Sequence, residues 1–450
     1  MRMRMDSKRG LALAMALFAL AGGAAAQSGT GINSTYEFFS KANFTHLTDP
    51  SPVFKTMSYY ELVTLLESDG THKILFGGSW CGNTQAVIAQ INDVAKEYGV
   101  KTIYNFDWKL DGAALHVRDT KNAYANLYVD VINKYLPNIV TIYEKEKNNV
   151  NYTNKDGAVV VANKLQVPFL FLYNRNNKDA KGNPAPVVAS YEKMLTWEKD
   201  FMTDGKDDPV KIEAYKKEIR PLFEFISKPV GGKKVAQLDY LDDFALYSLA
   251  YNKRAGTTIL DEKDKPFVLT TVSYFELKKI LESPGNYVFM FGGPWCGNTQ
   301  AVIKLVNQYA KKYDIDTVYT FDNKLDSNVL HIRDTKNPYA NLYVDLVAKY
   351  FPGIVTEYAP EKNGVSYVDK DGKTVLVNKL QVPYVFVYNK DWKDAQGNPK
   401  PILGQVELMY KWQDIQSDYV NDKGEVGKNY KTYTAALDAL FSAFKAKLGK

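Results

Sequence analysis

Phe76-Gly-Gly-Ser-Trp-Cys-Gly-Asn-Thr-Gln-Ala-Val-Ile88 is repeated 215 residues later as Phe291-Gly-Gly-Pro-Trp-Cys-Gly-Asn-Thr-Gln-Ala-Val-Ile303. The same offset holds without a gap from Ser58–Trp197 to Ser273–Trp412. A repeat of this length is within the usual size of one domain. The sequence therefore predicts two copies of one unit.

The flanking sequence indicates where the two units begin and end. The first residues are basic, an apolar run follows from Leu11 to Ala21, and small residues come next, a pattern typical of an export signal. Pro, Gly and Lys cluster in Ser227–Ala236, which favours a boundary there. We expect an export signal over residues 1–26, a first domain over 27–235 and a second domain over 236–450. The expected location is periplasmic or extracellular.

Composition excludes several classes of protein. The chain has 450 residues, a net charge of +6 and only two cysteines, Cys81 and Cys296. Two cysteines cannot build a disulfide-dense scaffold or a four-cysteine zinc site. Beyond the signal, no apolar run approaches the roughly 18 residues of a membrane span, and no Lys/Arg block is interleaved with aromatic residues. We therefore expect no membrane span and no nucleic-acid partner.

Each unit alternates helical and strand patterns. Ser58-Tyr-Tyr-Glu61 and Ser273-Tyr-Phe-Glu276 match the capping box that starts a helix. A short apolar run then ends at Phe76, and apolar residues at helical spacing follow over 84–98. Cys81 is thus expected at a strand-to-helix turn. Further strands are expected over 102–106 and 167–173 and further helices over 123–135 and 212–226, which favours an α/β sheet with helices on both faces.

These motifs resemble the thioredoxin-like superfamily. Trp80-Cys81-Gly82 opens a helix after an apolar strand, Val167-Pro168 begins a later strand, and Trp295-Cys296-Gly297 and Val382-Pro383 repeat the pattern. The resemblance implies two tandem thioredoxin-like domains, each with a central mixed sheet flanked by helices. It further implies that Pro168 and Pro383 are cis and lie beside the cysteines, and that Val167 and Val382 offer backbone hydrogen bonds to an extended peptide.

The sequence also departs from that family. Dithiol members use Cys-x-x-Cys, whereas Thr84 and Thr299 take the second position here. Leu75 and Met290 stand where thioredoxins keep a buried acid that assists proton transfer. Pro168 follows Cys81 by 87 residues, so an inserted helical and hairpin subdomain is expected in each unit, over about 107–163 and 322–378. Asp156-Gly157 and Asp371-Gly372 predict two-residue hairpin turns within these insertions.

A single cysteine in this position can still be a nucleophile. The open amides and positive dipole end of a helix N-terminus favour the thiolate form of Cys81 and Cys296. Thr84 and Thr299, one helical turn on, could donate a hydroxyl hydrogen bond to the same sulfur. Such a thiolate can form a mixed disulfide, and release then needs an external thiol or the cysteine of the other unit.

The expected function is that of an exported monothiol thiol–disulfide protein that acts on protein or peptide thiols and disulfides, with an external thiol as reductant. No cofactor and no metal are expected. The expected catalytic residues are Cys81, Cys296, Thr84 and Thr299. The expected substrate-binding residues are Trp80, Trp295, Val167, Pro168, Val382 and Pro383.

Two alternatives stay open at this point. Free cysteine is among the most buried residue types, so Cys81 and Cys296 could be small apolar residues of a non-enzymatic peptide-binding or adaptor protein. The two cysteines could also form a disulfide with each other, which needs Cα atoms within about 7 Å.

A histidine and an arginine two residues apart occur in both units. His116 and Arg118 recur as His331 and Arg333. Each pair could hold an anion near the thiolate, or serve as structural polar groups, with Arg118 paired to a carboxylate such as Asp107 or Asp119. One His and one Cys per unit are too few for zinc. The stretch 369–372 resembles a fragment of a calcium loop but is more typical of a turn.

Overall fold

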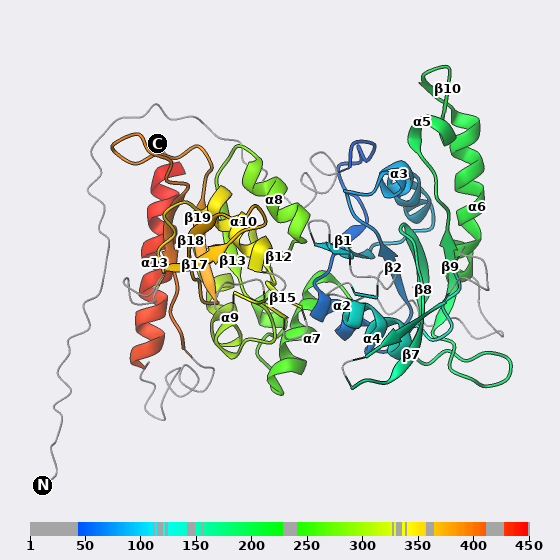
Figure 1. The fold of residues 1–450 in the computed structure, drawn as a ribbon, viewed down its shortest axis with the longest axis horizontal. Coiled ribbons are helices and arrows are strands. Elements are labelled where there is room, and N and C mark those ends of the chain that lie inside the picture. Colours follow the sequence, from blue (N-terminus) through cyan, green and yellow to red (C-terminus); the bar gives the residue numbers. More distant parts are fainter. Residues whose placement is uncertain are drawn as a thin grey trace, which may run out of the picture.

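A computed structural model describes residues 44–110, 113–114, 120–121, 125–141, 149–154, 156–227, 241–325, 328–329, 335–337, 340–356, 364–410 and 427–448. We call residues 44–227 the first repeat and residues 241–448 the second repeat. Each repeat contains one five-stranded sheet with helices packed against it (Figure 1).

The first repeat begins with a strand and ends with a long helix. Its elements are β1 (Phe54–Thr56), α2 (Tyr59–Leu66), β2 (His72–Phe76), α3 (Gly82–Glu97), β3 (Ile103–Phe106), β4 (Lys109–Leu110), β5 (Ala113–Ala114), α4 (Ala125–Tyr135), β6 (Asn149–Thr153), β7 (Val159–Asn163), β8 (Phe169–Tyr173), β9 (Val187–Glu192), α5 (Trp197–Asp200), β10 (Met202–Thr203), β11 (Lys206–Asp207) and α6 (Pro209–Ser227).

In the second repeat the first described element is helix α7, and the sheet strands and helices then follow in the same order. Its elements are α7 (Asp243–Ala255), the 3-10 helix η4 (Glu262–Asp264), β12 (Leu269–Thr271), α8 (Tyr274–Glu282), β13 (Tyr287–Phe291), α9 (Gly297–Lys312), β14 (Val318–Phe321), β15 (Lys324–Leu325), β16 (Asn328–Val329), α10 (Ala340–Tyr350), β17 (Gly364–Val368), β18 (Thr374–Asn378), β19 (Tyr384–Tyr388), β20 (Ile402–Val406) and α13 (Lys428–Leu448).

The two sheets share one topology. The strand order is β1-β3-β2-β8-β9 in the first and β12-β14-β13-β19-β20 in the second. In the first sheet β1, β3 and β2 are parallel, whereas β8 and β9 are antiparallel to their neighbours, and the second sheet repeats these pairings. The expected mixed sheet flanked by helices is confirmed, and this topology is compatible with a thioredoxin-like fold.

The central strand of each sheet is buried on both faces. Leu75 packs in a cluster with α3 and α6, whereas Ile74 and Phe76 belong to the cluster on the opposite face. This division follows from the alternation of side chains along a strand. In the second repeat Met290 packs with α9 and α13 in the same way. The short apolar run that ends at Phe76 is therefore part of a core strand with buried clusters on both faces.

The hairpins within the insertions are present, but their turns differ from the expectation. In the second repeat Val368 pairs with Thr374, so five residues connect the strands rather than two. The Asp369 carboxylate accepts hydrogen bonds from the amides of Asp371 and Lys373. The amide of Gly372 donates to the Asp369 carbonyl oxygen at 3.0 Å, and Gly372 has a φ of 76°. The prediction of a two-residue turn at Asp371-Gly372 was wrong, because Gly372 closes a longer turn that begins at Asp369. The expected turn is present at this position.

The two repeats meet near the middle of the molecule in Figure 1, through the edge strands β1 and β12 and the helices α2 and α8, which begin with the capping boxes. The hydroxyl of Thr56 donates to the Glu276 carboxylate at 2.8 Å, and the hydroxyl of Thr271 donates to the Glu61 carboxylate at 3.1 Å. Thr56 and Thr271 are repeat partners, as are Glu61 and Glu276. The contact is therefore reciprocal, as in a two-fold symmetric dimer of one unit.

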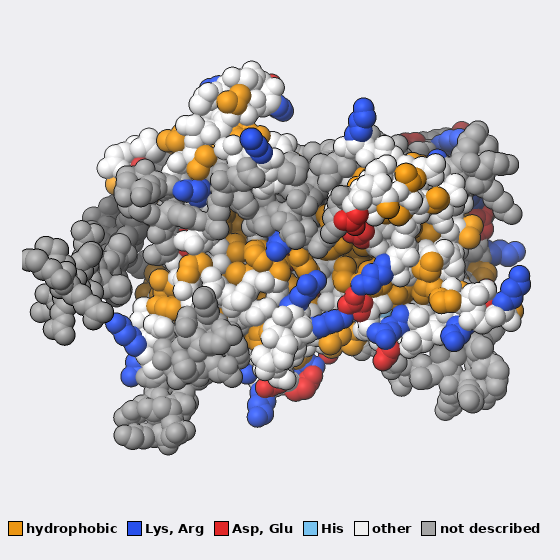
Figure 2. Space-filling view, turned by 60° about the horizontal axis from the view of Figure 1, so that its bottom comes forward, with side chains coloured by type: hydrophobic (Ala, Val, Ile, Leu, Met, Phe, Trp, Pro, Cys, Tyr) orange, Lys and Arg blue, Asp and Glu red, His pale blue; other side chains and the backbone are white. Residues whose placement is uncertain are grey.

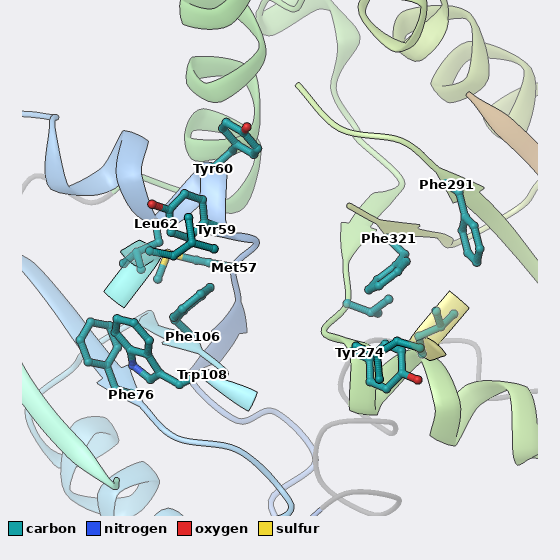
Figure 3. Packing of buried hydrophobic residues seen from close by; sticks show 14 of the residues in the cluster. Met57, Tyr59, Tyr60, Leu62, Phe76, Phe106, Trp108, Tyr274, Phe291 and Phe321 are labelled. Carbon is teal, nitrogen blue, oxygen red and sulfur yellow. The ribbon is translucent and has the colours of Figure 1, made fainter. Parts of the chain in front are cut away.

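Aromatic and aliphatic side chains surround this polar contact. One hydrophobic cluster contains residues of both repeats. Figure 3 shows Tyr59, Phe106 and Trp108 of the first repeat on one side and Tyr274 and Phe321 of the second repeat on the other. The carboxylates of the capping boxes are thus buried at a largely apolar junction.

Helix α7 contacts both repeats at the junction. It packs against α2 of the first repeat and against α9 of the second. Lys253 forms an ion pair with Glu67, and the Arg254 guanidinium lies 4.3 Å from the centre of the Tyr60 ring. Within the described residues, this helix thus connects the second repeat to the first.

None of the helices in the described ranges has the length and hydropathy that a bilayer crossing requires. On the face drawn in Figure 2, Lys and Arg side chains stand apart from one another among apolar and acidic ones.

The reciprocal hydrogen bonds predict a stability effect. Thr271→Val removes the hydroxyl donor to the buried Glu61 carboxylate at nearly constant volume. Because a buried acceptor that loses its partner costs about 1–3 kcal/mol, urea denaturation should show a lower free energy of unfolding by that amount. Thr374→Val, at an exposed strand position, is the control and should stay within about 0.5 kcal/mol of the parent protein. Equal effects of the two substitutions would contradict the interpretation.

Candidate thiol site

Cys81 and Cys296 occupy the same place in the two repeats. Each is the residue that caps the N-terminus of the helix after the central strand, α3 or α9, in extended backbone conformation. Their exposed fractions are 8% and 9%, and both thiols are free. The expected strand-to-helix position of the cysteines is confirmed, whereas a disulfide between them is not present.

The residues before β8 and β19 lie directly against the sulfur atoms. Val167-Pro168 and Val382-Pro383 are cis peptide bonds. The Cys81 thiol donates to the Val167 carbonyl oxygen at 3.5 Å, and the Cys296 thiol donates to the Val382 carbonyl oxygen at 3.6 Å. The expected cis prolines and their position beside the cysteines are therefore confirmed.

The threonines lie in the expected turn but do not contact the sulfur. Thr84 and Thr299 are fully buried, and their hydroxyl oxygens have no hydrogen-bond partner. The side chain of Thr84 packs against Gly77, where a Cβ atom would lie 2.9 Å from its methyl carbon. The expected hydroxyl hydrogen bond to the sulfur is not formed, because the threonine side chain points to the end of the central strand instead.

The tryptophans before the cysteines are held by two aspartates. The indole N–H of Trp80 donates to the Asp107 carboxylate at 2.7 Å, and that of Trp295 donates to Asp322 at 2.8 Å. The same aspartates accept the backbone amides of Lys109 and Lys324. Each aspartate directly follows the strand beside the central one, β3 or β14, so the sheet itself positions the tryptophan.

The aspartates lie against the backbone of the cysteine motif. A Cβ atom on Gly78 would be 2.6 Å from an Asp107 carboxylate oxygen, and Gly293 is similarly close to Asp322. Glycine is therefore required at this position of the Gly-Gly turn, because a larger residue would displace the carboxylate. One carboxylate oxygen of Asp322 is buried without a hydrogen-bond partner.

Burial changes the electrostatics of these two carboxyl groups. Desolvation raises the pKa of Asp107 to about 7, although the hydrogen bonds from Trp80 and Lys109 act in the opposite direction. Desolvation likewise raises the pKa of Asp322 to about 7. The ammonium groups of Lys109 and Lys324 lie 4.6 Å from the centres of the Trp80 and Trp295 rings. Each thiol site thus contains an aromatic ring between a buried acid and a cation.

Two amide side chains secure the loop before and after the cysteine. Gln85 donates to the Ser79 carbonyl at 2.7 Å, which fastens the motif turn to the first turn of the helix. Asn83 donates to the thioether sulfur of Met194 at 3.3 Å, and Asn298 donates to Met409 at 3.4 Å. The recurrence of these contacts shows that the two repeats build one and the same site.

The two His and Arg pairs stay a prediction, because His116, Arg118, His331 and Arg333 lie outside the described residues. Asp107, one of the carboxylates expected to pair with Arg118, accepts the indole hydrogen bond of Trp80. No group of three or more His, Cys, Asp or Glu side chains within the described ranges is arranged to hold a metal ion.

Sequence reasoning missed the aspartates and the methionines as site residues. Asp107 and Asp322 carry a recognisable signal, since each follows a strand that ends in Phe and recurs at the repeat offset. Met194 and Met409 recur at the same offset but carry no pattern of their own. These methionines reach the site only because the chain, after β9 and β20, returns to the N-termini of α3 and α9.

Comparisons with known proteins add little to this description. No model of a protein family matches the chain, and no curated protein does. Among solved structures the chain is similar to two crystal forms of ERdj5, each at 11% sequence identity. Form I gives a TM-score of 0.17 over 80% of this chain and 28% of that protein, and form II gives 0.20 over 88% and 30%. The chain thus spans less than a third of the length of ERdj5.

The raised pKa values predict a pH-dependent stability. An unfolded chain loses an aspartate proton near pH 4, whereas folded Asp107 and Asp322 keep theirs to about pH 7. Between these values the unfolded state binds fewer protons, so the free energy of unfolding should fall as pH rises, by at most about 1.4 kcal/mol per pH unit for each group.

Asp107→Asn with Asp322→Asn tests this effect. The asparagine oxygen can still accept the indole hydrogen bond, but the group no longer titrates. Urea denaturation followed between pH 4 and pH 8 should give a shallower decrease in the free energy of unfolding for the double variant than for the parent protein. An unchanged slope would show that the aspartates are ionised throughout this range.

Proposed function

We propose that the protein is an exported, tandem thioredoxin-like thiol–disulfide protein with one nucleophilic cysteine in each repeat. The observation that carries the proposal is the contact between the sulfur and the carbonyl of the residue before a cis proline, at 3.5 Å for Cys81 and 3.6 Å for Cys296. This carbonyl belongs to a loop that leads into an antiparallel strand, where an extended peptide would bring its own backbone beside the sulfur.

The proposed reaction is a thiol–disulfide exchange. The Cys81 or Cys296 thiolate attacks one sulfur of a substrate disulfide, a new S–S bond forms to that sulfur, and the other sulfur leaves as a thiolate that takes up a proton. An external low-molecular-weight thiol then attacks the mixed disulfide, forms an S–S bond to the substrate sulfur, and regenerates the cysteine. Neither step needs a second cysteine in the repeat, and no net oxidant is consumed.

The surrounding residues would orient the substrate. Trp80 and Trp295 are only partly buried, and each is fixed by its indole hydrogen bond to an aspartate. A rigid aromatic face next to the thiol offers apolar contact area at a low cost in conformational entropy. Val167 and Val382 are partly buried beside it. We propose protein or peptide substrates on this basis.

A second candidate is a non-enzymatic peptide-binding protein on the same scaffold. It is favoured by the low exposure of the cysteines and by the direction of the thiol hydrogen bond, since a carbonyl acceptor stabilises the protonated thiol rather than the thiolate. In that case the residues beside the cis prolines bind peptides and the sulfur takes no part.

Thiol titration of the folded protein separates the two candidates. The single variants Cys81→Ser and Cys296→Ser each leave one thiol to follow. With 5,5′-dithiobis(2-nitrobenzoate) near pH 7.5, the thiol–disulfide function predicts that each folded single-cysteine variant releases one equivalent of coloured thionitrobenzoate. The other half of the reagent should stay on the protein as a mixed disulfide, visible by intact mass. If colour appears only after the chain is unfolded in guanidinium chloride, the redox function is wrong and the peptide-binding candidate remains.

Restoring a dithiol motif provides a gain-of-function test. Thr84→Cys with Thr299→Cys places a second sulfur one helical turn from each cysteine. If the backbone of the site is competent, the variant should reduce insulin disulfides with dithiothreitol at least about tenfold faster than the parent protein, because a local thiol releases the mixed disulfide. Thr84→Ser with Thr299→Ser is the control and should show no gain.

A further inference from the structure

The thiol site of each repeat is adjacent to a carboxyl group of the other repeat. A small cavity of about 10 Å³ lies behind the Gly-Gly turn of the second repeat. Its lining includes Asp322 and Pro294 of that repeat and Glu61 of the first. Glu61 accepts a hydrogen bond from Thr271, and Thr271 pairs in the sheet with Thr320, two residues before Asp322, so the two carboxyl groups face the same small cavity.

The repeat partners are placed in the same way at the first thiol site, where Glu276 accepts a hydrogen bond from Thr56, which pairs in the sheet with Asn105, two residues before Asp107. Glu276 of the second repeat interacts electrostatically with Asp107, and Glu61 interacts with Asp322, in each case raising the pKa of the aspartate. Like charges that share a buried site oppose each other's ionisation. The reciprocal hydrogen bonds from Thr271 to Glu61 and from Thr56 to Glu276 hold the glutamates in this position.

The remaining charged and titratable groups at the junction are few. Lys55 faces both glutamates and lowers the pKa of each, while burial raises them. Lys109 and Lys324 face the two aspartates. Tyr247 and Tyr251 of α7 line the cavity at Asp322 and stay protonated, because burial raises the pKa of both phenols above the usual value.

We propose that Glu61 and Glu276 are positioning residues for the thiol sites of the opposite repeats. Each acts through the aspartate that holds the tryptophan next to the cysteine, so Glu61 acts on Cys296 through Asp322 and Trp295, and Glu276 acts on Cys81 through Asp107 and Trp80. The two thiol sites are thereby coupled across the junction. The role assigned to the cysteines rests on the proposed function, whereas the coupling of the carboxyl groups does not.

The coupling has a defined direction. Ionisation of Glu61 adds a negative charge behind Asp322, which keeps that aspartate protonated to higher pH. Loss of this charge allows Asp322 to ionise at lower pH, which changes the group that holds Trp295 next to Cys296. Because the glutamates belong to the other repeat, a change in one repeat alters the thiol of its neighbour rather than its own.

Indole resonances provide the first test, since each indole N–H is bonded to one of the aspartates. The chemical shift of the Trp295 Nε1–H should titrate with Asp322, and that of Trp80 with Asp107. In Glu61→Gln the Trp295 midpoint should move to lower pH while the Trp80 midpoint stays in place, and Glu276→Gln should give the converse. Trp80→Phe and Trp295→Phe assign the two resonances.

Two controls separate coupling from a damaged helix cap. Ser58→Ala removes the other half of the capping box in the helix that carries Glu61 but keeps the carboxylate, and Ser273→Ala does the same for Glu276. These variants should shift the midpoints less than the glutamate variants do, because each carboxyl group stays at the junction although it loses the interaction with the serine side chain. In an Asp322→Asn background, Glu61→Gln should have no further effect on Trp295. A shift in the glutamate's own repeat, an equal shift in both repeats, or the same shift with Ser58→Ala would overturn the proposal.

Thiol alkylation extends the test to the sulfur. In the Cys81→Ser background, Glu61→Gln should change the rate of Cys296 alkylation by iodoacetamide at fixed pH, and in the Cys296→Ser background it should leave the rate of Cys81 alkylation unchanged. Crossed indole shifts without any exchange with disulfides would uphold the coupling and remove the proposed function. Disulfide exchange without crossed indole shifts would do the reverse.

Discussion

Two buried carboxylates at the junction between the repeats set the constraint on which the rest of the structure depends. An unpaired carboxylate in such a place costs several kcal/mol, so Glu61 and Glu276 need hydrogen-bond donors from every side. Each receives one from the capping serine of its own helix and one from a threonine of the other repeat. Neither repeat alone satisfies its own glutamate, which ties the position of the edge strands to that of the capping helices.

The same residues show what the sequence could and could not predict. Ser58 and Glu61 predicted a helix start correctly, because a capping box is a contact within four residues. The second hydrogen bond of Glu61 comes from Thr271, 210 residues further along the chain. No local pattern encodes such a contact, and its reciprocal character becomes visible only when both repeats are placed in space.

For the thiol site, too, the contacts that short motifs predicted are confirmed, whereas those that depend on side-chain direction or on distant segments were wrong or missed. The position of Cys81 at a helix start, and the cis proline beside it, followed from short motifs and the family resemblance, and both are confirmed. The prediction that the Thr84 hydroxyl bonds the sulfur was wrong. Helical spacing determines on which turn the side chain lies, but the rotamer determines which residue it contacts. Here the side chain meets Gly77, at the end of the central strand. The role of Asp107 as a site residue was missed for a related reason. Its partner Trp80 lies between β2 and α3, whereas Asp107 follows β3, so the two residues are brought together only by the fold.

The duplication therefore does more than supply a second copy of the cysteine. In a repeat standing alone, Asp107 would keep Trp80 and Lys109 as partners but lose the field of Glu276, and the Glu61 carboxylate would lose Thr271. The electrostatic surroundings of each thiol are completed by the other repeat. At Asp322 helix α7 also takes part, because Tyr247 and Tyr251 line the cavity there. The surroundings of a thiol site are therefore a property of the paired repeats rather than of either repeat alone.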